Sequence, residues 1–281
     1  MSPGQNSPPR ATWRLLISPP ADGATNMAVD EAILHALADA PETGWPTLRF
    51  FQWDPPCLSL GYSQRWADVD EAACARLGYT WVRRPTGGRA ILHTDELTYS
   101  VIAPETEPRL AGSLIESYRS LSRGLLSGLN RLGSAPIQAK GEKGRNPQQS
   151  AACFDTPSYY EITHTDGRKL IGSAQVRRRG MVLQHGTLPL RGDITRILEV
   201  LNLAEAERAS LKESLAARAL TLEQALRRPV SFEEAVEAIS RGFEQALNLR
   251  LEPGELTDRE QALVEELRRQ RYAAAEWNQR L

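Results

Sequence analysis

The chain has 281 residues, a length that suits one large domain or one domain with a short extension. Hydrophobic residues make up 41% of it and charged residues 25%, and these values exclude an intrinsically disordered protein. The formal net charge of −1 argues against a nucleic-acid-binding protein built on bulk positive charge, and no apolar run of 18 residues indicates a membrane span. The first ten residues carry no signal-peptide pattern, so we expect a cytoplasmic protein. We also expect a monomer, without a nucleic-acid or membrane partner.

In chain order, a loose tail over residues 1–10 precedes short apolar runs that are typical of strands and that alternate with helical patterns. These strands are predicted over residues 13–17, 47–53, 58–60, 80–84 and 97–102. A glycine turn at residues 83–89 separates the last two strands. Because glycine tolerates unusual φ angles and close contact, Gly87 and Gly88 could present backbone N–H groups to a carbonyl or a phosphate.

Capping residues predict where the first helices begin. Asn26 is the expected N-cap of the first helix, since its side chain can accept a hydrogen bond from the first turn. The apolar face of this helix is expected from Val29, Ile33 and Leu37. Asp68 with Glu71 predicts a capping box for a short Ala-rich helix that ends at Gly78.

Two further capping boxes, Ser113 with Glu116 and Ser231 with Glu234, predict longer amphipathic helices. Their inward positions are expected at Leu114, Leu121, Leu125 and Leu129 in the first, and at Phe232, Val236, Ile239 and Phe243 in the second. From about residue 195 the pattern is helical, so the strands of the sheet are expected before that point.

Residues 134–157 hold several glycines and prolines and few apolar side chains, which predicts a long loop of the kind that is often functional. A hairpin follows, with Asp166 and Gly167 as its turn. The hairpin strands and the strand after them are predicted over residues 159–164, 169–177 and 181–190. A two-residue turn at this place pairs Lys169 with His164.

Together these elements predict an α+β fold with a mixed, mostly antiparallel sheet flanked by helices. Phe243 is expected to pack onto the sheet, so the helix that carries it belongs to the main domain. The domains are expected as a tail over residues 1–10, a main domain over residues 11–250 and a C-terminal helical extension over residues 251–281.

The common hydrolase, dehydrogenase, phosphate-loop and paired-histidine zinc motifs are missing, and three cysteines are too few for a disulfide framework or a zinc cluster. Cys57 and Cys74 lie in apolar segments that predict small buried side chains. Cys153 lies in a loop that leads into a strand, where its thiol could face a cleft and act as a nucleophile beside a cation. Packing of this thiol as a small apolar group is the alternative.

The other candidate residues are each open to two interpretations. Lys169 is either a functional cation or a solvated hairpin lysine. Gly172 and Ala174 are unusually small for strand positions, which indicates either space for a ligand or tight packing. His93 and His185 are either acid–base groups or hydrogen-bonded structural histidines.

Four motifs, in this order, resemble those of the biotin/lipoate protein ligase superfamily. They are RRPTGGRAILH at residues 83–93, ACFDTPS at 152–158, GRKLIGSAQ at 167–175 and LQHGT at 183–187. Within the superfamily the chain is most similar to the cysteine-dependent octanoyltransferases of the LipM type, from about residue 26 to residue 190 and weakly near residues 272–278. The resemblance implies transfer of an octanoyl group from octanoyl-acyl carrier protein, through a Cys thioester, to a lysine of a lipoyl-accepting protein such as the glycine cleavage H protein.

The resemblance also implies the roles of the site residues, with no cofactor and no metal. Cys153 would be the nucleophile and Lys169 the cation that favours its thiolate. The acyl and carbonyl site would be lined by Arg84, Gly87, Gly88 and His93, and the tunnel by Gly172, Ala174, His185 and Gly186. The arginine run at residues 177–179, otherwise a solvated strand edge, is a hypothetical dock for the acidic carrier protein.

Three alternatives stay open: an amidotransferase that draws octanoyl groups from the H protein, an ATP-dependent lipoate ligase, and an inactive lipoyl-domain binding module. ATP-dependent ligases of the superfamily generally have an Asn-Asp pair near the place of Tyr160 and Glu161 and lack the cysteine motif, which favours the transferase. The predicted hairpin places Lys169 about 20 Å from the strand end that Cys153 precedes, so the loop must fold back for the two to meet.

Overall fold

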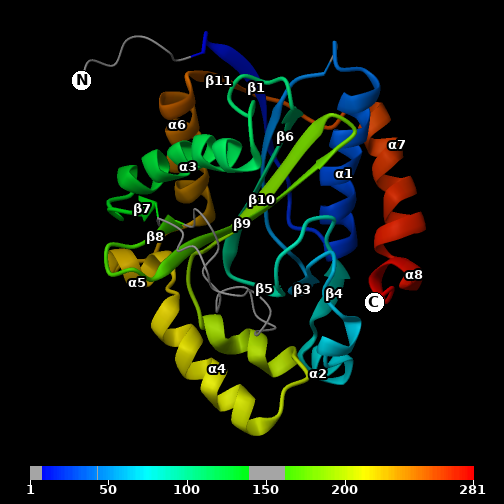
Figure 1. Cartoon of the computed structure of the whole chain (residues 1–281), viewed down its shortest axis with the longest axis vertical. Helices are drawn as coiled ribbons and strands as arrows, with labels where there is room; N and C mark the ends of the chain where they lie inside the picture. The colour runs from blue at the N-terminus through cyan, green and yellow to red at the C-terminus, as the bar shows by residue number, and fades with distance from the viewer. Residues whose placement is uncertain (1–7, 43, 139–161) are drawn as a thin grey trace.

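The computed structural model describes residues 8–42, 44–138 and 162–281 of the chain. Over these residues, helices cover both faces of a central sheet, and a smaller sheet lies at one end of it (Figure 1). The chain is therefore a layered α+β protein, as its sequence predicts.

The central sheet has eight strands. Their order is β11 (Leu249–Pro253), β1 (Ala11–Ile17), β2 (Thr47–Phe51), β6 (Glu96–Pro104), β10 (Met181–Pro189), β9 (Lys169–Arg178), β8 (Ile162–Thr163) and β7 (Ile137–Gln138). Strand β1 is parallel to both β11 and β2, whereas every other neighbouring pair is antiparallel. The predicted mixed, mostly antiparallel sheet is confirmed. Most of the predicted 134–157 loop lies outside the described residues, although β7 occupies part of its beginning.

Two pairs of helices cover the two faces of this sheet (Figure 1). Helices α1 (Gly23–Asp39) and α7 (Asp258–Leu267) pack on one face, and α3 (Leu114–Arg131) and α6 (Phe232–Leu247) on the other. Side chains alternate along a strand, so Phe50 of β2 joins the core under α3 and α6 while Phe51 joins the core under α1. The sheet is thus buried on both faces.

The smaller sheet carries the glycine turn. Its strands, in order, are β4 (Thr80–Arg83), β3 (Cys57–Leu60) and β5 (Ile91–His93). A third apolar core joins this sheet to α2 (Glu71–Leu77), to the 3₁₀ helix η3 (Ile194–Val200) and to α4 (Glu205–Arg218). The remaining short helices are η1 (Trp66–Asp68), α5 (Leu222–Leu226), η4 (Arg268–Tyr272) and α8 (Ala275–Asn278).

The N-cap of α1 differs from the prediction. Asp22, not Asn26, caps the helix, because its carboxylate accepts a hydrogen bond of 2.7 Å from the Thr25 backbone N–H. Asn26 lies one turn later and is buried. Its side-chain amide donates to the carbonyls of Ala21 and Gln52, at 3.0 and 2.9 Å, and so joins α1 to the end of β2.

The capping box predicted for α2 is wrong, and the one predicted for α6 is correct only in part. Asp70, not Asp68, caps α2, since Asp68 belongs to η1 just before it. Ser231 does cap α6 and accepts a hydrogen bond from the Glu234 backbone N–H. The carboxylate of Glu234 pairs instead with Arg228 and does not close the box.

The predicted capping box of α3 is confirmed, with Ser113 and Glu116 bonding reciprocally, and so is the end of α2 at Gly78, which has a φ of 72°. The inward orientation predicted for Leu114 is wrong. This side chain is 47% exposed, because the first turn of α3 projects beyond the core that the later leucines of the helix fill.

The hairpin between β8 and β9 has a different register from the one predicted. Lys169 pairs with Thr163, not with His164. The turn contains three residues, since His164 N–H donates to the Arg168 carbonyl at 2.8 Å and Gly167 N–H donates back to the His164 carbonyl at 2.9 Å. Gly167 has a φ of 88°, the left-handed conformation that such turns require.

The C-terminal segment is helical and returns to the N-terminal part of the fold. Strand β11 spans the domain boundary predicted at residue 250 and pairs with β1, and α7 packs along α1 (Figure 1). The carboxylate of Glu260 on α7 binds the guanidinium of Arg14 on β1 at 2.6 and 2.7 Å. The domain boundaries stay a prediction.

Helices α3 and α6 cross at glycines. A Cβ atom added at Gly242 would lie 2.3 Å from the Gly128 nitrogen and 2.4 Å from the Gly124 carbonyl oxygen. These contacts are with backbone atoms, which cannot rotate away, so a side chain at this crossing forces the helices apart.

We predict that Gly242→Ala lowers the free energy of unfolding by about 1–3 kcal/mol, the usual cost of overpacking a core. Asn130→Ala, on the exposed side of α3, is the matched control and is expected to change it by less than about 0.5 kcal/mol. Equilibrium urea denaturation measures both. Wild-type stability in Gly242→Ala would contradict the close crossing.

Candidate functional site

The glycine turn between β4 and β5 packs directly against a neighbouring loop. A Cβ atom at Gly61 would lie 1.9 Å from the Gly88 carbonyl oxygen, so the two backbones touch. The Tyr62 backbone N–H donates to the Thr86 carbonyl at 2.8 Å. Gly88 has a φ of 92°, which explains why glycine occupies this position.

Arg84 lies beneath the turn and is buried. Its guanidinium donates to the carbonyls of Gly87, at 2.8 and 3.2 Å, and Arg89, at 2.7 Å. A trans peptide unit directs its C=O and N–H groups to opposite sides, so the Gly88 N–H points away from Arg84. Among the described residues, no atom lies within 4 Å of a Cβ atom added at Gly87, so no described residue covers the outer side of the turn there. Arg84 therefore orients the backbone of the turn from inside.

The same guanidinium reaches a second group of buried polar side chains. Arg84 donates to the carbonyl and the hydroxyl of Ser59 at 2.9 and 3.1 Å, and that hydroxyl lies 2.7 Å from His93 Nε2. His93 Nδ1 contacts the Glu96 carboxylate, and its ring stacks on Trp53 with centroids 3.9 Å apart. His93 is thus held within the interior of the smaller sheet, beneath the turn.

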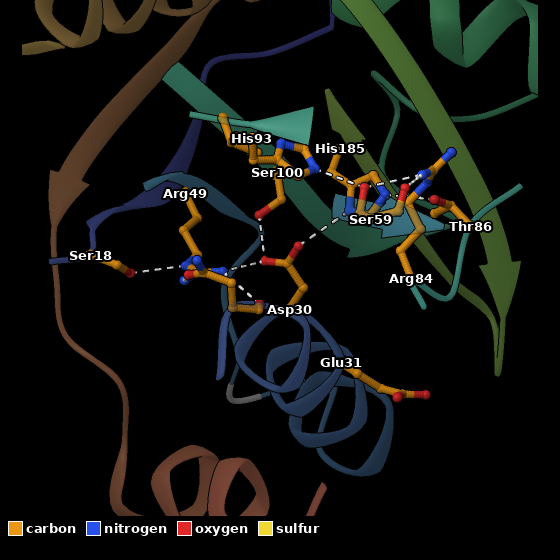
Figure 2. A network of polar contacts seen from close by, with 12 residues as sticks. Ser18, Asp30, Glu31, Arg49, Ser59, Arg84, Thr86, His93, Ser100 and His185 are labelled. Atoms are coloured by element: carbon orange, nitrogen blue, oxygen red, sulfur yellow. Dashed lines mark hydrogen bonds and ion pairs between the residues drawn. The ribbon is translucent and has the colours of Figure 1, made fainter. Parts of the chain in front are cut away.

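Figure 2 shows a further buried network, centred on Asp30 of α1. One oxygen of the Asp30 carboxylate accepts hydrogen bonds of 2.8 Å from Arg49 of β2 and from the Ser100 hydroxyl of β6. The second oxygen lies 3.5 Å from His185 Nδ1 of β10. His185 Nε2 lies 2.6 Å from the Thr86 hydroxyl, within the glycine turn. A chain of polar contacts therefore runs from the interior to the turn.

The charges in this network decide where the protons lie. Burial alone would raise the pKa of Asp30, but Arg49 and His185 hold it below its usual range, so Asp30 is ionised. Burial lowers the pKa of His185, although Asp30 acts in the opposite direction, so the ring is neutral at pH 7. A carboxylate only accepts, so we expect the single ring proton on Nδ1, which faces Asp30, and we expect Nε2 to accept from Thr86.

Strands β9 and β10 bring three of the expected tunnel residues to one face. Ala174 is paired with His185 and Gly172 with Thr187, so Gly172 and Ala174 share the face on which His185 meets α1. Gly186 belongs to the other face. A Cβ atom there would lie 2.5 Å from the Gly172 carbonyl and 2.7 Å from the Tyr99 ring, so Gly186 is required by packing.

Lys169 begins β9 and is buried, so it is not a solvated hairpin lysine. Its carbonyl accepts a hydrogen bond of 3.1 Å from the Leu220 N–H. Gly172 follows it by three residue steps of an extended strand, so the two positions are about 10 Å apart along β9. Cys153 lies outside the described residues, and the pair that it is expected to form with Lys169 stays a prediction.

The other two cysteines are buried, as predicted. Burial raises the pKa of Cys57 to about 12 and that of Cys74 to about 11, so both remain thiols at neutral pH. Neither is suited to be a nucleophile.

A cleft of about 870 Å³ opens beside the glycine turn. Pro85 and Gly87 border it at the turn, and the buried Leu183 lies at its apolar floor. Its remaining walls are formed mainly by Tyr62, residues 175–178 of β9, Arg271 and Trp277. The turn therefore faces a space large enough for a ligand.

Of the three arginines at residues 177–179, Arg177 is held by hydrogen bonds within the fold, whereas Arg178 and Arg179 are exposed. Arg177 donates to the carbonyls of Leu110 and Gly112 and so joins β9 to the segment before α3. Arg178 and Arg179 pair with Glu31 and Asp39 of α1, and their side chains remain 52% and 43% exposed.

Five buried residues of the site were not predicted from the sequence: Asp30, Arg49, Ser59, Ser100 and Thr86. One signal for the central pair was present, because Arg49 stands in the apolar strand 47–51 and Asp30 in the apolar helix 23–39. A charge in such a setting is buried only with a partner of opposite sign.

Among the described residues, no group of three or more histidine, cysteine or acidic side chains is arranged to hold a metal ion. No helix in the described ranges is both long and apolar enough to span a membrane.

Comparison with known proteins gives one consistent result. The profile of the lipoyl protein ligase A/B catalytic domain matches residues 22–244. The octanoyltransferase LipM of Kyrpidia tusciae is 46% identical over 96% of this chain and 99% of its own length, and that of Brevibacillus brevis is 42% identical over 95% and 99%. Among solved structures, a bi-partite lipoate protein ligase from Thermoplasma acidophilum, studied with its E2 lipoyl domain, has a TM-score of 0.81 at 25% identity and covers 96% of this chain and 97% of its own.

The lowered pKa of His185 predicts a pH dependence of stability. The unfolded chain binds a proton at this histidine below about pH 6.5, whereas the folded chain, in which the pKa is lowered, binds it only at lower pH, so folding loses stability as the pH falls below about 6.5. The contribution is at most about 1.4 kcal/mol per pH unit.

We expect His185→Gln to remove this contribution, so that the unfolding free energy falls less steeply between pH 6.5 and 5 than in the wild type. His164→Gln, in the hairpin turn, controls for loss of an imidazole elsewhere in the chain. Urea denaturation across this pH range is the measurement. Parallel curves for the wild type and His185→Gln would show that His185 is not held neutral.

Proposed function

The chain belongs to the lipoyl protein ligase A/B catalytic-domain family and, within it, to the octanoyltransferases of the LipM type, and we propose that it transfers octanoyl groups in protein lipoylation. The observation that carries this proposal is the near full-length similarity to octanoyltransferases. The enzyme is thus an acyltransferase.

In this proposal the glycine turn binds the acyl carbonyl. Arg84 holds the carbonyls of Gly87 and Arg89 on the inner side, so the Gly88 N–H faces outward beside the cleft. A backbone N–H that is already oriented stabilises the negative charge that develops on a carbonyl oxygen during acyl transfer. This role requires only backbone atoms, which agrees with the glycines at these positions.

Cys153 is the proposed nucleophile. The Cys153 thiol gives up its proton, and the thiolate attacks the carbonyl of octanoyl-acyl carrier protein. A new C–S bond forms, the C–S bond of the donor breaks, and the donor leaves as a thiol that takes up that proton. The amine of the acceptor lysine, on a lipoyl-accepting protein such as the glycine cleavage H protein, then attacks the enzyme thioester. An amide bond forms and the Cys153 thiol is released. A thioester carries enough free energy for this amide, so the reaction needs no ATP.

Lys169 is the proposed cation beside this thiolate. A cation near a cysteine favours the thiolate and so lowers the pKa of the thiol. The thiols of Cys57 and Cys74, in contrast, are buried and have raised pKa values, which supports Cys153 as the nucleophile among the three cysteines.

We propose that the tunnel for the octanoyl chain and the docking site for the donor protein lie on the same face of the sheet. Gly172 and Ala174 lie on the face that carries His185, and their small size suits an octanoyl chain without polar groups. Arg178 and Arg179 retain exposed guanidinium groups at the nearby strand end, which suits an acidic carrier protein.

Two other functions differ from this one in the donor. An amidotransferase would take octanoyl groups from the H protein, and an ATP-dependent lipoate ligase would need free lipoate and release pyrophosphate. The solved relative with a TM-score of 0.81 is a lipoate protein ligase, which keeps the ligase as the second candidate. Competition between donors distinguishes the first pair, and pyrophosphate release identifies the ligase.

We predict that Cys153→Ala abolishes octanoyl transfer and the covalent adduct, because the variant has no sulfur at that position to form the thioester. Cys74→Ala is the matched control and should keep both. The protein is mixed with octanoyl-acyl carrier protein, and its intact mass is measured with and without acceptor. An adduct of one octanoyl group on Cys153→Ala, with product formed at the normal rate, would exclude Cys153 as the nucleophile.

A further inference from the structure

Arg83 is a buried cation that is held by backbone carbonyls. It lies at the end of β4, directly before Arg84, and its side chain is fully buried. Its guanidinium donates five hydrogen bonds to backbone carbonyls. Within the described part of the chain, no carboxylate forms an ion pair with it. A buried charge is costly unless its hydrogen bonds are satisfied, so these carbonyls must be kept in place.

Two of the contacts come from the C-terminal segment, 195 residues away. The Asn278 carbonyl accepts from Nε and Nη2 of Arg83, at 3.1 and 2.8 Å. The Asn278 side chain accepts from the Arg83 backbone N–H at 2.8 Å and donates to the Tyr272 carbonyl at 2.8 Å. The Trp277 indole donates to the Arg83 carbonyl at 2.8 Å. Helix α8 and Arg83 therefore bind each other through both backbone and side chains.

The other contacts of Arg83 lie in the loop that touches the glycine turn. Nη1 donates to the carbonyls of Gly61, Tyr62 and Gln64. In the same loop, the Tyr62 N–H donates to Thr86 of the turn, and Gly61 packs against the turn backbone. Arg83 thus connects the C-terminal segment to the turn through residues 61–64.

Arg280 makes a second link between these parts. Its guanidinium lies 3.7 Å above the Tyr62 ring and 4.1 Å from the centre of the Trp277 ring, and it donates to the Tyr62 carbonyl at 2.7 Å. Tyr62 and Trp277 also form part of the wall of the cleft beside the turn. The C-terminal segment therefore contributes both to the support of the turn and to the cleft.

We propose that Asn278 and Trp277 are positioning residues that act through Arg83 to set the place of the glycine turn. The inference rests on the proposed function of the turn as the site that binds the acyl carbonyl. The C-terminal segment is then a part of the acyl-transfer site, and its described hydrogen bonds reach the turn through Arg83 and the loop at 61–64.

The test compares two variants of the C-terminal segment in the full-length protein. Asn278→Ala removes the side-chain bonds to Arg83 and Tyr272. Glu260→Gln weakens the contact between α7 and Arg14, which holds the same segment but does not reach the turn. Hydrogen exchange of the Tyr62 amide, which donates to the Thr86 carbonyl of the turn, reports the contact with the turn directly, and steady-state kinetics of octanoyl transfer report its use.

In Asn278→Ala we expect exchange of the Tyr62 amide to be at least fivefold faster and kcat to fall about tenfold, with a smaller change in KM. In Glu260→Gln, the exchange rate and kcat should stay within twofold of the wild type, even where its melting temperature falls as much as that of Asn278→Ala. If Asn278→Ala does not fold, Trp277→Phe takes its place. This variant removes only the indole N–H donor, and its exchange and kcat should change in the same direction.

The proposal would be overturned if both α8 variants had the same exchange rate and the same kcat as Glu260→Gln. The exchange measurement needs no substrate, so it decides the support of the turn even if the wild type transfers no octanoyl group. Absence of transfer by the wild type, with faster exchange in Asn278→Ala, contradicts the proposed function alone.

Discussion

The geometry around the glycine turn depends on the buried ion pair between Asp30 and Arg49. This pair joins α1 to β2 inside the protein, and the ionised carboxylate of Asp30 faces His185. The orientation of His185 in turn sets its contact with Thr86 of the turn. Removal of Arg49 would leave an unpaired buried carboxylate, which is strongly destabilising. The ion pair is therefore a condition for the arrangement of the site.

Three sets of hydrogen bonds hold the turn from different directions. Arg84 binds its carbonyls from inside, His185 binds the Thr86 hydroxyl, and the loop at residues 61–64 binds its backbone with the support of Arg83. A turn restrained in this way presents its N–H groups with little reorganisation, and such preorganised donors are an effective means of stabilising an oxyanion. The glycines give the turn its shape, and the surrounding buried polar side chains keep it in place.

Local signals in the sequence predicted much of the fold. Strand alternation, capping residues and the hairpin turn located most elements, because each depends on neighbours within about four residues. The errors were also local: Asn26 and Asp68 resemble N-caps, but Asp22 and Asp70 are better placed for the N–H groups of the first turn. The hairpin register shifted because its turn contains three residues and not two.

The support of the site was not predictable in the same way. Asp30 and Arg49 are 19 residues apart, and Arg83 and Asn278 are 195 apart, so no spacing rule connects them. Only the folded sheet brings them together. The motifs at residues 83–93, 167–175 and 183–187 did indicate the segments that meet beside the cleft, whereas the roles of His93 and Arg84 as interior supports depend on contacts that the motifs do not show.

The protonation state of His185 tests this account most directly. The ¹⁵N chemical shifts of its imidazole can be measured by NMR at pH 7 in protein labelled at histidine. The account predicts a neutral ring with its proton on Nδ1, directed at Asp30, and an unprotonated Nε2 that accepts from Thr86. A doubly protonated ring, or a proton on Nε2, would contradict it.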